Sequence, residues 1–328
     1  MMPRRTVAAA AAALFPALAR AQPASDTPSR SWAPSRPVRI IVPFAAGGVA
    51  DLTVRTVGSR LAERIGLPVV VDNRPSAGGI VAAGQLMGAA PDGHTLLTTT
   101  NGTAISRGLF RSLPYDPLRD LASVVTLAAF PIAVLVAPGG ARDVGALLAR
   151  LRAEPGRLNI GTIASGSTQN LSAELFKIRA GVRAETIAFP ATPQAITALL
   201  RGDVDAVFEI TGPIKGQIDG GAVRAVAVSS ATRAESLPNV PTLAEAGVPD
   251  YDVASWNALS ARTGTPPEAI AFLNRAVNEV LADPATRAAL TASGVEIRGG
   301  PPDALTRLLA ADTARWAEVI EKAGIERQ

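Results

Sequence analysis

The sequence has no cysteine and only one histidine, His94, among its 328 residues. The lack of thiols excludes disulfide bonds, thiol catalysis, iron–sulfur clusters and cysteine-ligated zinc. A single histidine argues against a histidine-rich metal site and against a Ser-His-Asp catalytic triad. We therefore expect no metal and no cofactor, and the stability of the fold must come from a large hydrophobic core.

Charged residues (18%) and aromatic residues (4%) are also scarce, whereas hydrophobic residues make up 48%. This composition is typical of a globular protein, and the length allows two domains, each with its own core. The formal net charge is +4, and three positive charges, Arg4, Arg5 and Arg20, lie in a segment that we expect to be removed, which leaves about +1. A nearly neutral chain with few aromatic side chains does not resemble a nucleic-acid binder.

Residues 1–21 have the pattern of a secretory signal peptide. Arg4 and Arg5 precede the small apolar stretch TVAAAAAALFPAL, and Ala19-Arg20-Ala21 fits an A-x-A cleavage site before Gln22. The stretch is shorter than the roughly 20 apolar residues of a membrane anchor, and the arginine pair leaves a twin-arginine signal open as an alternative. We expect the mature protein to function outside the cytoplasm, with a flexible leader at residues 22–36, which are rich in Ser, Pro and Ala.

Strand and helix patterns alternate twice along the chain. The strands predicted in the first half are Val38–Val42, Val69–Val71 and Leu96–Thr100, and those in the second half are Leu158–Thr162, Glu185–Ala188, Val204–Phe208 and Val223–Val228. Helical spacing of apolar residues lies between most of them. This alternation predicts an α/β fold in which helices cover both faces of parallel sheets.

Two chain crossings join the halves. The first is a long apolar stretch, Val124 to Val136, which we expect Pro131 to break, and the second lies near Tyr251 to Leu259. Two lobes joined by two crossings predict a hinged ligand cleft. We expect lobe 1 to comprise residues 37–131 and 252–328, and lobe 2 to comprise residues 132–251.

A pair of glycines, Gly47-Gly48, lies between the first strand and the first helix, in a segment that we call the glycine turn (residues 44–51). Ligands of α/β sheets bind at the carboxyl ends of the strands, where helix starts point free N–H groups outward. Glycines let the backbone aim several of these groups at one anion, and we expect Asp51 to cap the helix. The stretch taken alone is explained equally well by a plain tight turn.

A second candidate is the serine turn (residues 165–168), which ends the run Gly161-Thr-Ile-Ala-Ser-Gly-Ser-Thr168. The run has the glycine spacing of a phosphate-binding P-loop, but a serine replaces the lysine. A hydroxyl-rich helix start therefore suits a carboxylate or a sugar better than a nucleoside triphosphate. The alternative is an ordinary Ser/Thr helix cap.

Three isolated residues have two interpretations each. His94 is either a base or a structural or surface residue, Trp256 either lines the cleft or packs in the core, and Glu209 either reaches the cleft or is solvated. None of the motifs G-x-S-x-G, H-E-x-x-H and G-x-G-x-x-G occurs in the sequence. We therefore do not expect an enzyme.

Five motifs, in order, resemble the Bug family, the extracytoplasmic solute receptors of tripartite tricarboxylate transporters. They are VPFAAGGVAD, VVVDNRPSAGG, PDGHTLL, LPYDPLRDLA and LPNVPTLAEAG, the last followed by Trp256. The resemblance runs from about Pro37 to about Ile325. It implies a type II periplasmic binding protein, in which two α/β lobes close on a small organic acid, and a location in the periplasm of a Gram-negative bacterium.

The resemblance also implies a binding site in which backbone amides and helix N-termini, rather than an arginine, hold the ligand carboxylate. The glycine turn and the serine turn would face each other across the cleft. The candidate ligand-binding residues are Phe44, Ala46, Gly47, Gly48, Asp51, Ser165, Gly166, Ser167, Thr168, Thr192 and Glu209. No residue is expected to be catalytic or to bind a metal.

The chain departs from the family pattern at three places. Val49 stands where the family usually has proline, and His94 stands where it usually has tyrosine. The segment Ala188-Phe189-Pro190-Ala191-Thr192 replaces a V-P-Y-K-G segment that resembles a cleft-lining loop. The third departure removes a tyrosine hydroxyl and a lysine, and so bears on which ligand is bound.

We therefore expect a monomeric periplasmic solute-binding protein that captures a small carboxylate-bearing organic acid and delivers it to a tripartite tricarboxylate-type transporter. Ligand binding would stabilise the closed form. A second hypothesis is that the closed form contacts a sensor kinase instead. A third, a secreted hydrolase, lacks a nucleophile motif.

Overall fold

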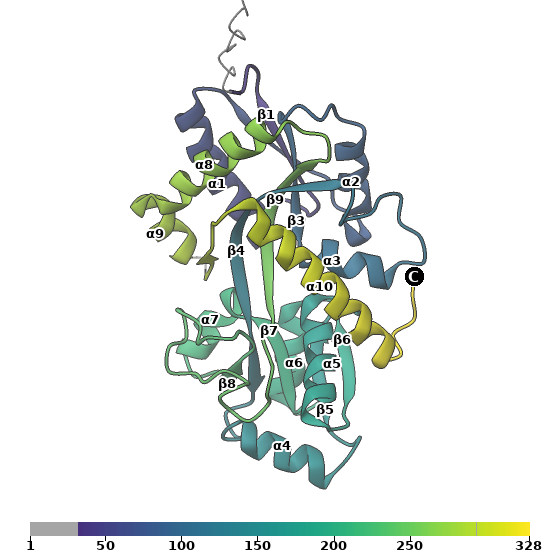
Figure 1. The fold of residues 1–328 in the computed structure, drawn as a ribbon. Helices are drawn as coiled ribbons and strands as arrows, with labels where there is room; N and C mark the ends of the chain where they lie inside the picture. The colour runs from purple at the N-terminus through teal and green to yellow at the C-terminus, as the bar shows by residue number, and fades with distance from the viewer. Residues whose placement is uncertain (1–31, 293) are drawn as a thin grey trace, which may run out of the picture. The chain divides into compact units, whose positions relative to one another are not determined.

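The computed structural model describes residues 32–292 and 294–328 (Figure 1). The predicted signal peptide and residues 22–31 of the predicted leader lie outside this part of the chain. Trp32 packs on the fold, because its ring lies 5.5 Å from the rings of both His94 and Phe272. The backbone N–H of Ser35 donates to Nε2 of His94 at 3.1 Å. His94 is buried. Through its contacts with Trp32 and Ser35 it fixes the start of the described chain to the fold, which agrees with the structural interpretation.

The first three strands are parallel and have β1 at their centre. Ile40 of β1 pairs with Val71 on one side and with Leu96 on the other. These strands are β1 (Val38–Val42), β2 (Val69–Asn73) and β3 (Thr95–Thr100), and the helical segments after them are α1 (Val49–Ile65), the 3-10 turn η1 (Ala77–Gly79), α2 (Ile80–Met87) and α3 (Asn101–Leu109). Because the strands are parallel, the segments that leave their carboxyl ends all start at one edge of the sheet.

Two long antiparallel strands, β4 (Leu121–Val136) and β9 (Ala254–Arg262), carry the chain between the two halves. Our expectation that Pro131 breaks the first crossing is wrong, because β4 continues through it. Pro131 pairs with Ala254, the first residue of β9, and the next residue, Ile132, pairs with Ile210 of β7. A proline, which lacks an N–H, is tolerated here because β4 changes partners at this point.

The second half repeats the arrangement with different residues. Gly161 of β5 pairs in parallel with Ile187 of β6 and with Val207 of β7. The strands are β5 (Asn159–Ile163), β6 (Glu185–Phe189), β7 (Ala206–Ile210) and β8 (Arg224–Val228), and the helices are α4 (Val144–Ala153), α5 (Thr168–Ala180), α6 (Thr192–Arg201) and α7 (Thr211–Asp219). The strand order is β2-β1-β3-β9-β4-β7-β5-β6, and β8 and β10 both pair with β4.

The remaining elements are α8 (Pro267–Ala282), α9 (Pro284–Ala292), β10 (Glu296–Ile297) and α10 (Pro302–Lys322). Helix α10 packs against α3, β4 and α5 (Figure 1). Its residues Leu309 and Trp316 share one hydrophobic cluster with Ile105 of α3 and Phe176 of α5. The division into lobes at residues 131/132 and 251/252 stays a prediction, and α10, from predicted lobe 1, contacts α5 of predicted lobe 2.

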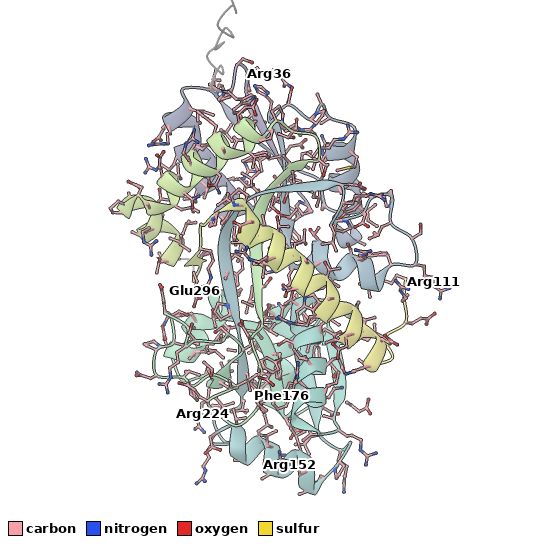
Figure 2. All side chains as sticks on the ribbon, in the orientation of Figure 1. Arg36, Arg111, Arg152, Phe176, Arg224 and Glu296 are labelled. Carbon is pink, nitrogen blue, oxygen red and sulfur yellow. The ribbon has the colours of Figure 1, made fainter. Side chains whose placement is uncertain are left out.

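The core lies between the sheet and the helices. Figure 2 shows Phe176 inside the fold, whereas Arg152 and Arg224 lie on the outside. The ring of Phe176 lies 5.4 Å from the ring of Phe208, and both side chains are fully buried. Burial of a side chain of this kind stabilises the folded state by about 1.5–3 kcal/mol. No helix within residues 32–292 and 294–328 has both the length and the apolar character that a membrane crossing requires.

Candidate functional site

The glycine turn links the carboxyl end of β1 to the start of α1. Gly47 has a φ of +88°, a left-handed conformation that glycine adopts without the strain of a Cβ atom. Gly48 is the N-cap of α1, with φ −76° and ψ 166°, and provides no side-chain cap. The first N–H groups of a helix have no partner within the helix. The start of α1 therefore presents several backbone N–H groups that can donate hydrogen bonds to an anion.

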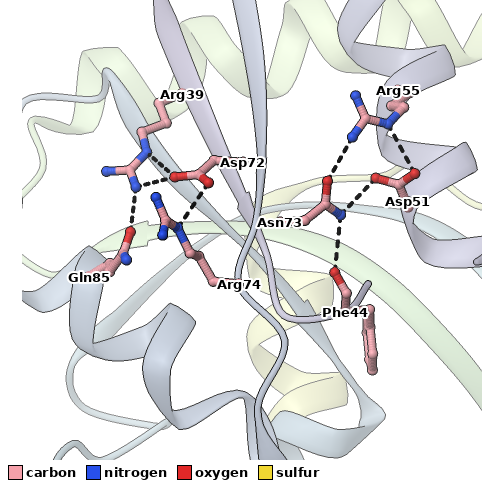
Figure 3. Close-up of polar contacts among 8 residues, drawn as sticks. All are labelled: Arg39, Phe44, Asp51, Arg55, Asp72, Asn73, Arg74 and Gln85. Atoms are coloured by element: carbon pink, nitrogen blue, oxygen red, sulfur yellow. Dashed lines mark hydrogen bonds and ion pairs between the residues drawn. The ribbon is translucent and has the colours of Figure 1, made fainter. Parts of the chain in front are cut away.

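Asp51, the third residue of α1, is 1% exposed. Its Oδ2 accepts a hydrogen bond from the N–H of Gly47 at 2.9 Å. Figure 3 shows its two side-chain partners: Oδ2 accepts from Nε of Arg55 at 2.9 Å, and Oδ1 accepts from Nδ2 of Asn73 at 2.8 Å. Our prediction that Asp51 caps the helix is wrong: Gly48 occupies the N-cap, and the carboxylate of Asp51 reaches back over the first turn to Gly47. Burial raises the pKa of Asp51, but these hydrogen bonds outweigh burial and hold the pKa below its ordinary value of 3.8.

A second set of charges lies beside this turn, at the end of β2. Nε of Arg39 donates to Oδ2 of Asp72 at 2.9 Å, and Nε of Arg74 lies 2.9 Å from Oδ1. The hydrogen bond from Arg39 is the main reason that the pKa of Asp72 is lowered. Nδ2 of Asn73 also donates to the carbonyl oxygen of Phe44 at 3.0 Å. Figure 3 shows two separate groups: Asp72 with Arg39 and Arg74, which has one net positive charge, and Asp51 with Arg55, in which the charges balance.

The serine turn links β5 to α5. Gly166 has a φ of +76°, and its N–H donates to Oδ1 of Asn170 at 3.0 Å. Ser167 is the N-cap of α5, and its Oγ accepts from the N–H of Asn170 at 3.1 Å and donates to the carbonyl oxygen of Ile163 at 2.8 Å. Ser165 is exposed and Thr168 is buried. Ser167 therefore does cap its helix, which was one of our two interpretations.

The two turns have nearly the same backbone geometry. Each has a glycine with positive φ, followed by an N-cap residue; the N-cap angles are φ −76° and ψ 166° at Gly48, and φ −71° and ψ 163° at Ser167. In each, the glycine N–H donates to a side-chain oxygen four residues later, on Asp51 or Asn170. The acceptor is a carboxylate in the glycine turn and a neutral amide in the serine turn.

Glu209 lies at the carboxyl end of β7 and is 1% exposed, so the interpretation that it is solvated is wrong. Its Oε1 accepts from Nε2 of Gln169 at 2.7 Å and from the N–H of Ile210 at 2.8 Å, and its Oε2 accepts from Oγ1 of Thr192 at 2.8 Å. Burial raises the pKa of Glu209 above its ordinary value of 4.5, and the three hydrogen bonds oppose this shift.

The structure thus places the predicted site residues in two groups. The first comprises Phe44, Ala46, Gly47, Gly48 and Asp51 in the glycine turn. The second comprises Ser165, Gly166, Ser167 and Thr168 in the serine turn, with Thr192 and Glu209 attached through Gln169. No hydrogen bond or ion pair joins the two groups within the described part of the chain.

Sequence reasoning missed Gln169, which connects the serine turn to Glu209, and it missed α3. Helix α3 starts at the end of β3, where Thr100 and Thr103 form a capping box. The polar run Thr98 to Thr103, which spans the end of β3 and the start of α3, was the available signal. Thr211, the first residue of α7, is fully buried, and its hydroxyl has no hydrogen-bond partner among the described residues.

Trp256 belongs to the core rather than to an exposed cleft wall. It is 2% exposed, and its Nε1 donates to Oδ2 of Asp312 in α10 at 2.7 Å. Nδ2 of Asn101, the first residue of α3, donates to the carbonyl oxygen of Ala254 at 2.9 Å. These contacts tie α3 and α10 to the second crossing strand. Across residues 32–292 and 294–328, no group of three or more His, Asp or Glu side chains is arranged to hold a metal ion.

Comparisons of the sequence and of the fold with known proteins point to the same class of protein, the periplasmic solute receptors. Residues 53–325 match the family described as tripartite tricarboxylate transporter family receptor. Protein BugT of Bordetella pertussis is 35% identical over 294 residues, which are 89% of this chain and 90% of BugT. The structure of R. palustris Rpa4515 with adipate is 34% identical, with a TM-score of 0.76 over 90% of this chain and 99% of that chain. The periplasmic binding protein BugD is 28% identical, with a TM-score of 0.72 over 90% of this chain and 100% of BugD.

The fold is that of the two-lobed α/β periplasmic binding proteins, which hold a ligand in the cleft between their lobes. The chain belongs to the tripartite tricarboxylate transporter receptor family, as its Bug-type motifs indicated. It is accordingly a solute-binding receptor and not an enzyme.

Proposed function

We propose that this protein captures a small carboxylate-bearing organic acid in the periplasm. The observation that carries the proposal is the shared geometry of the glycine turn and the serine turn, in which a positive-φ glycine leads into a helix start with free N–H groups. Two helix starts of this kind attract anions through their N–H donors and through the helix dipole. The net positive charge beside the glycine turn favours the same kind of ligand.

Some of the candidate residues bind the ligand, and others hold the two turns in shape. The backbone amides at the start of α1 bind the carboxylate, while Asp51 holds the turn in shape through its bond to Gly47. The serine turn binds the ligand from the other side, and Gln169, Thr192 and Glu209 hold the serine turn in place. Both turns contact the ligand only in the closed form, so binding shifts the population toward that form.

The protein is proposed to act as a monomer that delivers its ligand to the membrane subunits of a tripartite tricarboxylate-type transporter. Family membership supports this partner, and Rpa4515, which was solved with adipate, supports an organic acid as the ligand. The signal-peptide pattern at residues 1–21 supports export to the periplasm.

Thermal unfolding of the chain from Gln22 onward, measured with organic acids, amino acids, sugars and nucleotides, tests the ligand class. A ligand at a hundredfold excess over its Kd raises the free energy of unfolding by about 2.7 kcal/mol. We expect a stabilising shift with a carboxylate and none with its ester. Shifts with uncharged sugars alone would contradict the proposal.

The partner is tested by co-purification from membranes of the native bacterium, with and without the ligand identified by thermal unfolding. We expect transporter subunits to be recovered with the liganded protein. Recovery of a sensor kinase instead would favour the second hypothesis. Size-exclusion chromatography with light scattering during the same preparation tests the monomer.

A further inference from the structure

Three helix starts converge on the carboxylate of Glu209. Its partners are the second residue of α5 (Gln169), the first residue of α6 (Thr192) and the N–H of Ile210, the N-cap of α7. These helices have 13, 10 and 9 residues. Because the N-terminus of a helix is the positive end of its dipole, Glu209 occupies the place where these three helices would otherwise attract an external anion.

No lysine, arginine or histidine forms an ion pair with Glu209 within the described residues, and its three partners are all neutral. Asp51 in the glycine turn differs, because Nε of Arg55 lies 2.9 Å from its carboxylate. The carboxylate of the glycine turn is therefore balanced by a cation, whereas the carboxylate beside the serine turn has no ion-pair partner among the described residues. The two sides of the site have similar backbone geometry and differ in whether their buried carboxylate is paired with a cation.

This difference acts on the ligand through Gln169, which directly follows Thr168 of the serine turn and binds Glu209 at 2.7 Å. A ligand carboxylate at the serine turn would be separated from the carboxylate of Glu209 by the length of one glutamine side chain. Two negative charges at such a separation in a protein interior repel each other. An amide or a hydroxyl group would not be repelled, and each has an oxygen that can accept from the N–H groups of the turn.

We propose that Glu209 determines specificity by excluding a second carboxylate from the serine turn, so that the preferred ligand has one carboxylate, bound at the glycine turn, and an uncharged polar group at its other end. The proposal rests on the proposed function, because it assumes that both turns contact the ligand. It assigns to this chain a ligand class different from a simple dicarboxylate such as adipate.

The test compares dicarboxylates with their half-amides by isothermal titration calorimetry at pH 8. Suitable pairs are succinate and succinamate, glutarate and glutaramate, and adipate and adipamate, which differ only in the charge at one end. For the pair of the preferred length, we expect the wild-type protein to bind the half-amide at least about tenfold more tightly than the dicarboxylate. Glu209→Gln should reduce this ratio to near one or reverse it, because the amide keeps the shape of the side chain and removes its charge.

Glu174→Gln is the matched control. Glu174 lies on α5, the helix that also carries Gln169. There it pairs with Lys177, three residues further along, at 2.9 Å. Its replacement should leave the ratio of the two affinities unchanged. The loss of any one negative charge near the serine turn would shift the ratio in both variants, whereas the proposed effect belongs to Glu209 in β7 alone.

The possible outcomes separate this inference from the proposed function. Wild-type protein that binds the dicarboxylate as tightly as the half-amide, or more tightly, overturns the role of Glu209 but leaves carboxylate capture intact. Failure of the panel of carboxylates to bind at all overturns the proposed function itself. If Glu209→Gln does not fold, a wild-type ratio near or below one still overturns the inference.

Discussion

Leu109, the last residue of α3, fills the space that a side chain on Gly166 would need. A Cβ atom at Gly166 would lie 2.7 Å from Cδ2 of Leu109, closer than real Cβ contacts come. Gly166 also has a φ of +76°. The backbone conformation of the serine turn therefore favours glycine, and any side chain at this position would also displace the end of Leu109.

Gly166→Ala should destabilise the protein by about 2–4 kcal/mol, since a left-handed conformation and an overpacked contact both add to the cost. It should also weaken ligand binding, because the serine turn must shift. Chemical unfolding and titration calorimetry measure the two effects.

The control is Gly202→Ala at the end of α6. Gly202 has a φ of +80°, and nothing lies within 4 Å of its Cβ position. This variant should lose only the backbone contribution, about 1–2 kcal/mol, and keep its affinity. Equal losses in the two variants would show that Leu109 makes no contribution.

Asp51→Ala should weaken ligand binding by about tenfold, because the carboxylate that orders Gly47, Arg55 and Asn73 is lost. Asp143→Ala is the comparison, since Asp143 caps α4 through the N–H of Ala146 at 2.7 Å. That variant should lose about 1 kcal/mol of stability and retain its affinity. If Asp51→Ala lowers the melting temperature but leaves Kd unchanged, Asp51 serves the stability of the turn alone.

Asp51 should also make stability depend on pH in the acid range. Its folded pKa lies below the ordinary value of 3.8, so its contribution is complete above that value and is lost as the pH falls through the folded pKa. The free energy of unfolding of the wild type, minus that of Asp51→Asn, should be constant from pH 7 to about 5 and decrease below about 4. A difference that stays constant down to pH 3 would contradict the hydrogen bonding described for Asp51.

Glu209 should have the opposite effect. Its folded pKa lies above the ordinary value of 4.5, so ionisation of the buried carboxyl destabilises the folded state above that pKa. As the pH falls through the folded pKa toward 4.5, this penalty disappears, and the wild type should gain stability relative to Glu209→Gln. Urea unfolding of both proteins between pH 8 and pH 4 measures the change. A relative loss of stability on acidification would mean that the hydrogen bonds from the three helix starts outweigh burial.

Much of the fold could be predicted from local patterns. The runs Val38 to Val42 and Val204 to Phe208 predict buried strands, and Gly47 and Gly166 mark turns, because strand alternation and positive-φ turns depend on neighbouring residues. The expected break at Pro131 failed for a physical reason. A proline ends a strand only where its missing N–H would be needed, and at Pro131 the strand changes partners.

The sequence by itself determined the α/β alternation, the two glycine-led turns and the family, because these depend on patterns of residues that are adjacent in the chain. Only the tertiary structure decided what the buried acids do. Asp51 bonds back to Gly47 and pairs with Arg55, while Glu209 joins the starts of three helices and has no ion-pair partner in the described part of the chain. The arrangement around Glu209 exists because β5, β6 and β7 are neighbours in the sheet, and strand order brings together helix starts that are about 20 to 40 residues apart in the chain.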